Sequence, residues 1–138
     1  MAKKINQWSL TLLRIILGII YIYHGYLKLF VAGGFAGTIG LFTKIGIPLP
    51  GVFALIVAVL EFGGGILLLI GLLTRWISLG IVIEMMVAIF KLHIQNGFLA
   101  GKNGYEFPML AIAALIIIIV NGPGTLSIGK LMKNKHFH

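Results

Sequence analysis

Four long stretches of the chain are almost entirely apolar. They run over residues 8–30, 50–73, 76–94 and 107–120, and glycine, proline or charged residues separate them. An apolar stretch of about 20 residues is long enough to cross a bilayer as an α-helix. The pattern therefore predicts an all-α, polytopic membrane protein, a four-transmembrane-helix bundle that forms a single domain over residues 1–138.

The segment 33–46 between the first two stretches is too short and too rich in glycine to cross a membrane. Its apolar residues recur at helical spacing, whereas Thr38 and Lys44 are polar. We expect a short amphipathic helix that lies on the outer surface of the membrane. Pro48 and Pro50 then break this helix and begin the second span, where proline is tolerated in the first turn.

Composition and charge agree with a membrane protein. The sequence is 59% hydrophobic and only 10% charged, with a mean hydropathy of +1.09, so the bilayer is the expected surrounding. The net charge of +8 does not indicate nucleic-acid binding, because the basic residues are divided among helix ends and loops. Their distribution instead predicts that both termini lie in the cytoplasm. Without cysteine, disulfides and thiolate metal sites are excluded.

The first span carries a stripe of polar and small residues, with His24 on its flank. Such a stripe on a spanning helix should face the interior of the bundle. At 100° per residue, it consists of Thr11, Arg14, Gly18, Tyr21, Gly25 and Lys28.

Each of the next two spans contains one carboxyl residue. Glu61 is followed by Phe62 and then by the three glycines 63–65. It shares a face with small residues of its helix. Glu84 likewise shares a face with small residues and with Lys91. A carboxylate near the centre of a bilayer costs about 2–3 kcal/mol or more, so it normally faces protein or a water-filled cavity.

Measured from the outer end of each helix, His24, Glu61 and Glu84 lie about 9, 16 and 15 Å deep. We therefore expect them to form one buried polar site and name them as the catalytic candidates, suited to proton transfer or to hydrogen-bonding a quinone-like ligand. Alternatively, the two acids pair with His24, Lys91 or Arg14 and hold the bundle in register. No metal site is predicted, because no His-x-x-Glu or Glu-x-x-His pair occurs.

The order of short motifs along the chain resembles that of the DoxX family of membrane proteins. The motifs are Leu12-Leu13-Arg14, His24-Gly25, Lys28-Leu29, Gly33-Gly34-Phe35, Gly46-Ile47-Pro48, Glu61-Phe62-Gly63-Gly64, Gly71-Leu72-Leu73-Thr74-Arg75, Asn96-Gly97-Phe98, Gly104-Tyr105-Glu106 and Gly122-Pro123-Gly124. The resemblance implies a four-helix bundle in the bacterial plasma membrane and a link to quinone redox chemistry.

The resemblance also adds residues to the candidate site. By motif position it includes Arg14, Lys28, Tyr105 and Glu106, whereas the candidacy of Glu84 depends on its burial alone. The helical pattern places Tyr21 and Lys91 beside the acids. The predicted ligand-binding residues are therefore Arg14, Tyr21, Lys28, Lys91, Tyr105 and Glu106.

Three functions are compatible with this sequence. The first is a membrane protein of a redox system that binds a quinone or a similar apolar ligand at His24, Glu61 and Glu84. The second is a non-catalytic membrane subunit or anchor for a soluble redox protein, and the third is a pathway for protons or small solutes. Homo-oligomerisation is compatible with each of them, because the helices carry small-residue faces.

Overall fold

The computed structural model describes residues 5–132, and every regular element in that range is helical. The α-helices are α1 (Gln7–Leu29), α2 (Gly34–Lys44), α3 (Pro50–Ile70), α4 (Thr74–Ala88), α5 (Glu106–Asn121) and α6 (Ile128–Leu131). Short π- and 3₁₀-helical turns join α4 to α5, and they are η1 (Ile89–His93), η2 (Ile94–Asn96) and η3 (Ala100–Lys102). The predicted all-α architecture is therefore confirmed.

Three helices are long and apolar enough to cross a membrane. They are α1, α3 and the continuous helical run Thr74–Asn96, with mean hydropathies of 1.6, 2.5 and 2.0. The fourth apolar helix, α5, has 16 residues and is about 24 Å long, shorter than a bilayer core of about 30 Å. Helix α2 forms where an amphipathic segment was expected. A fourth crossing by α5 and a surface position for α2 stay predictions.

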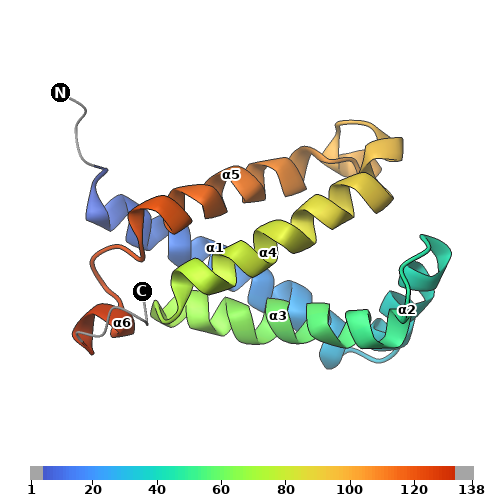
Figure 1. Cartoon of the computed structure of the whole chain (residues 1–138), viewed down its shortest axis with the longest axis horizontal. Helices are drawn as coiled ribbons and strands as arrows, with labels where there is room; N and C mark the ends of the chain where they lie inside the picture. The colour runs from blue at the N-terminus through green and yellow to red at the C-terminus, as the bar shows by residue number, and fades with distance from the viewer. Residues whose placement is uncertain (1–4, 133–138) are drawn as a thin grey trace.

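The helices associate as two pairs. Helix α1 packs along α3, and α4 packs along α5 (Figure 1). The start of α1, the α3–α4 turn and α6 lie at one end of the bundle, which we call the terminal end. Helix α2 and the turns η1 to η3 lie at the opposite, loop end (Figure 1). The core between the pairs is apolar and consists of Leu17, Tyr21, Leu68, Ile81, Met85, Ala111, Leu115 and Ile118.

Glycines allow α1 and α3 to touch along their backbones. A Cβ atom on Gly25 would lie 2.3 Å from the backbone nitrogen of Phe62, and one on Gly65 would lie 2.6 Å from that of Ile22. Small residues are common where membrane helices approach this closely. The predicted interior stripe of α1 is confirmed, because Arg14, Gly18, Tyr21 and Gly25 are all buried.

The interior face of α4 differs from the prediction. Its buried residues include Ile81 and Met85, whereas Glu84 is half-buried and Lys91 is exposed. Thr74 and Ser78 are also buried in α4, so the spacing of Gly80, Glu84 and Ala88 was a poor guide to its inner face. Lys91 lies in the π-helical turn η1, where i→i+5 hydrogen bonding changes the direction of the side chains.

Arg14 closes the terminal end of the bundle. Its side chain is 1% exposed, and its Nε atom donates to the carbonyl of Pro123 at 2.7 Å. Its Nη1 atom donates to the carbonyls of Leu68 and Leu69 at 2.5 and 2.7 Å, and Nη2 donates to that of Leu126. A single guanidinium therefore ties α1 to the end of α3 and to the chain that follows α5.

Candidate functional site

Glu61 forms an ion pair inside the bundle. Its side chain on α3 is 5% exposed, and its Oε2 atom lies 2.5 Å from the Nζ atom of Lys28 on α1, whose side chain is 22% exposed. The backbone contact between Gly25 and Phe62 brings these two helix turns together. The pairing neutralises a carboxylate that would otherwise be costly to bury.

Glu84 approaches the same carboxylate from α4. Glu84 lies close enough to Glu61 for their two carboxyl groups to interact. The Oε2 atom of Glu84 is buried and has no hydrogen-bond partner among the described residues.

Tyr21 adds a second buried polar atom without a partner. The residue is 1% exposed, and its hydroxyl group makes no hydrogen bond within the part of the chain that the structure describes. The hydroxyl lies close enough to Glu84 and Glu61 to interact with both charges. We call Tyr21, Lys28, Glu61 and Glu84 the Glu61 cluster.

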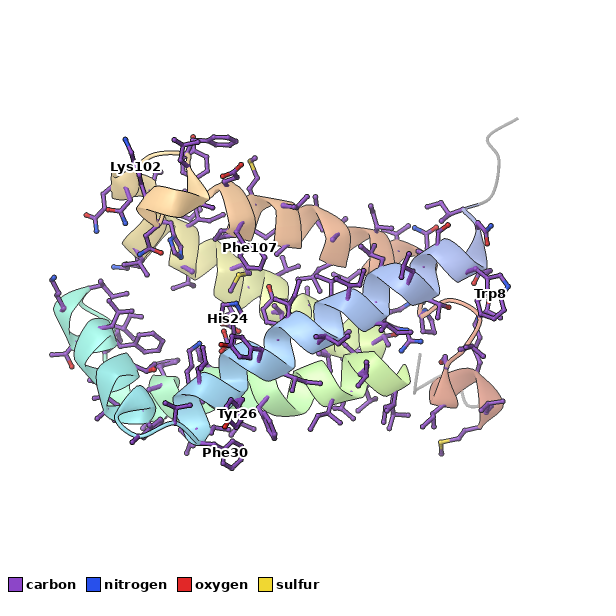
Figure 2. The ribbon with its side chains drawn as sticks, turned by 180° about the vertical axis from the view of Figure 1, so that it is seen from behind. Trp8, His24, Tyr26, Phe30, Lys102 and Phe107 are labelled. Atoms are coloured by element: carbon purple, nitrogen blue, oxygen red, sulfur yellow. The ribbon has the colours of Figure 1, made fainter. Side chains whose placement is uncertain are left out.

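His24 lies beside this cluster, but it is exposed and not buried as the sequence predicted. Its ring stacks on Phe107 of α5, with ring centroids 6.1 Å apart, and lies 6.4 Å from the ring of Tyr21. Figure 2 shows His24 and Phe107 facing each other across the middle of the molecule. The helix pairs do not close around the imidazole, because α1 and α5 share few contacts.

The structure therefore brings together all three catalytic candidates, and Tyr21 and Lys28 with them. Phe107, which the sequence analysis missed, stacks on His24 beside the cluster. Phe107 begins an apolar stretch without polar side chains, and nothing in that pattern distinguishes it from a packing residue.

Four of the predicted ligand-binding residues lie elsewhere. Arg14 binds backbone carbonyls at the terminal end, and Lys91 is exposed in η1. Tyr105 packs edge-on against Phe98 at 5.5 Å, and Glu106 accepts a hydrogen bond from the backbone N–H of Ala100 at 2.8 Å. The alternative in which the acids pair with Arg14 or Lys91 is wrong for Glu61, since its cation is Lys28.

The loop between η2 and α5 has its own hydrogen bonds, to which Tyr105 and Glu106 contribute. The backbone N–H of Tyr105 donates to Gly97 at 3.0 Å, and that of Glu106 donates to Phe98 at 2.9 Å. The two residues thus hold the loop that connects η2 to α5.

The unpartnered atoms define what the cluster can bind. The hydroxyl of Tyr21 can donate to a carbonyl oxygen, and the free oxygen of Glu84 can accept from a hydroxyl group. Buried polar atoms are normally satisfied, so two unpaired atoms near Glu61 indicate a place for a small polar group. The carbonyl and hydroxyl oxygens of a quinone and a quinol match this pair of requirements.

Comparison with known proteins decides the family. A family model described as DoxX matches residues 9–94 of the chain. The chain belongs to the DoxX family. The resemblance predicted from the motifs is thus confirmed, and the chain is an integral membrane protein of that family.

Several relatives of this DoxX chain are membrane proteins. The inner membrane protein YqjF of Escherichia coli is 30% identical over 135 residues, which cover 96% of this chain and 98% of YqjF. The "Putative oxidoreductase CatD" of Bacillus subtilis is 32% identical over 126 residues, or 91% of this chain and 88% of CatD.

A third relative is similar over a shorter region. It is an uncharacterized protein of Haemophilus influenzae, 37% identical over 67 residues, which cover 49% of this chain and 44% of that protein. No solved structure matches the DoxX chain.

Proposed function

We propose that this DoxX protein is an integral membrane component of a redox system and binds a quinone or a similar apolar carbonyl ligand at the Glu61 cluster. The observation that carries the proposal is the pair of buried, unpartnered atoms, the hydroxyl of Tyr21 and Oε2 of Glu84, beside one carboxylate. The name of CatD associates a relative with oxidoreductase chemistry and agrees with this class of ligand.

Each residue of the cluster has a role in this proposal. The hydroxyl of Tyr21 donates a hydrogen bond to a carbonyl oxygen of the ligand, and Glu84 accepts a hydrogen bond from a ligand hydroxyl. Lys28 fixes Glu61 in position through their 2.5 Å contact, and the carboxyl of Glu84 lies beside that of Glu61. The exposed ring of His24 stacks on Phe107 beside the cluster and provides an aromatic surface there.

The ligand supplies the redox chemistry when it is bound, and the chain supplies binding, orientation and proton-carrying groups. A soluble redox protein is the proposed source or acceptor of the electrons. The proposal also includes a bacterial plasma membrane location, a fourth crossing by α5 and cytoplasmic termini, as the distribution of basic residues predicts.

Binding of a short-chain quinone to the purified protein tests the proposal. We expect Tyr21→Phe to weaken binding about fivefold, because one hydrogen bond to a neutral partner contributes about 1 kcal/mol. The matched control is Tyr23→Phe, since Tyr23 lies on the same helix and is 60% exposed. Equal affinity of the wild type and of the double variant Tyr21→Phe/Glu84→Gln would refute the site.

A proton pathway is the second candidate function, and the contact between Glu61 and Glu84 favours it. Lys28, Glu61 and Glu84 form a chain of interacting polar groups across α1, α3 and α4. Proteoliposomes that contain a pH-sensitive dye would detect proton flux under an applied potential. Flux that persists unchanged in Glu61→Gln excludes this cluster as the route.

A further inference from the structure

The chain that follows α5 folds back against the terminal end of the bundle. The backbone N–H of Thr125 donates to the hydroxyl of Thr11 at 2.8 Å, and the hydroxyl of Ser127 donates to the carbonyl of Gly71 at 2.8 Å. The backbone N–H of Gly129 donates to the same carbonyl at 3.2 Å. These bonds hold α6 level with the ends of α1 and α3 (Figure 1).

The side chains of this segment are arranged in the reverse of the pattern found in water. The polar Ser127 and the small Gly129 are buried against the bundle. Leu126, Leu131 and Met132 point away from it and are 58%, 81% and 54% exposed. A helix end with polar contacts inside and large apolar side chains outside is suited to an apolar surrounding.

Tryptophan and basic side chains accompany these apolar residues. Trp8 and Trp76, the two tryptophans of the chain, are 58% and 68% exposed, and Figure 2 shows Trp8 at the same end of the molecule as α6. Tryptophan favours the boundary between lipid headgroups and acyl chains. Arg75 and Lys130 are exposed at this end as well, and Lys130 also donates to the side chain of Gln7.

No acidic residue offsets these charges at the terminal end. The sequence has three acidic residues, Glu61, Glu84 and Glu106. The first two lie in the Glu61 cluster, and Glu106 accepts a hydrogen bond from Ala100 in the loop at the opposite end. The terminal end is therefore purely basic across the described residues, which complements an anionic surface.

We propose that α6 and its neighbours form a binding surface for anionic phospholipid headgroups in the bilayer that surrounds the bundle. We call it the terminal platform, and it consists of Trp8, Arg75, Trp76, Leu126, Lys130, Leu131 and Met132. Leu126, Leu131 and Met132 enter the boundary of the acyl chains, and Arg75 and Lys130 contact the lipid phosphates. This surface is separate from the Glu61 cluster and does not depend on the function proposed for it.

Energy transfer from tryptophan to a labelled lipid tests the charge part of the proposal. In mixed vesicles, both tryptophans report on the terminal platform, so the wild type should transfer more energy to dansyl-phosphatidylglycerol than to dansyl-phosphatidylcholine. Arg75→Gln/Lys130→Gln should lower this preference roughly fivefold for each charge removed. The matched control, Lys44→Gln/Lys102→Gln, removes two exposed charges at the loop end and should leave the preference unchanged. Equal transfer to both lipids, or an equal loss in both variants, overturns the proposal.

A second measurement tests the depth of α6. We would place a single reporter by Leu131→Trp in a Trp8→Phe/Trp76→Phe background and compare quenching by brominated acyl chains with quenching by iodide in water. The proposal expects strong quenching by the brominated lipid and weak quenching by iodide. Quenching by iodide alone would place α6 in water, and protection from both agents would show that protein covers it. Either result overturns the proposal.

Discussion

Arg14 should be the most sensitive single position for the stability of the bundle. Its guanidinium is buried and donates hydrogen bonds to the carbonyls of Leu68, Leu69, Pro123 and Leu126. Arg14→Met keeps much of the side-chain volume and removes every one of these donors. The perturbation therefore tests hydrogen bonding rather than packing.

The magnitude follows from the carbonyls that the substitution would leave unpaired. The carbonyl of Leu68 still accepts a hydrogen bond from the backbone N–H of Gly71 at 3.1 Å. The carbonyls of Leu69, Pro123 and Leu126 therefore account for most of the lost stability. A buried polar group without a partner costs about 1–3 kcal/mol. Since water reaches the end of the bundle in part, we expect a total loss of about 3–6 kcal/mol, which is a large fraction of a typical folding free energy.

Thermal unfolding in detergent, followed by tryptophan fluorescence, measures this loss. We expect the melting temperature of Arg14→Met to fall by about 10–20 °C. Hydrogen exchange should show that the backbone amide of Thr125, which donates to Thr11, loses its protection. The control is Arg75→Met, which removes the same charge from an exposed arginine at the same end and should melt close to the wild type. If the two variants melt together and the Thr125 amide stays protected, Arg14 does not hold the terminal end.

Two further predictions concern the contact between α1 and α3. Gly25→Ala should lower the stability of the bundle by about 1–3 kcal/mol, because its Cβ atom would lie 2.3 Å from the backbone nitrogen of Phe62. The control is Gly37→Ala, at a helical position where a Cβ atom would meet nothing within 4 Å. It should melt at the temperature of the wild type or higher. Lys28→Met should cost about 2–3 kcal/mol, because it leaves Glu61 buried without its cation. Lys28→Met/Glu61→Leu should recover most of that loss, and a double variant no more stable than the single one would contradict this account of the pair.

The helix pattern could be predicted from the sequence because hydrophobic length and helix-breaking residues act locally. The second span was expected to extend to residue 73, but α3 ends at Ile70. The difference arises in the turn, where Gly71 and Leu73 adopt φ values of +76° and +53°. In the sequence, a single glycine only weakly indicates that a helix ends in such a left-handed turn.

The sequence could predict that His24, Glu61 and Glu84 lie close together, but not which basic residue pairs with Glu61. Depth along a helix places His24, Glu61 and Glu84 at similar heights, and the structure brings them together. Height does not decide which neighbour a side chain faces, so the alternative pairing named His24, Lys91 or Arg14 as the partner of the acids and not Lys28. The backbone contact at Gly25 brings Lys28 to Glu61, and it depends on how two distant segments pack.

The three glycines that follow Glu61 and Phe62 point in three directions. A Cβ atom on Gly63 would meet nothing within 4 Å, one on Gly64 would meet Ile77 of α4 at 3.0 Å, and one on Gly65 would meet Ile22 of α1. Helix α3 is thus held from two sides one turn below Glu61, and it cannot rotate about its axis without breaking both contacts. We expect ligand entry to leave the glycine-packed pair of α1 and α3 fixed.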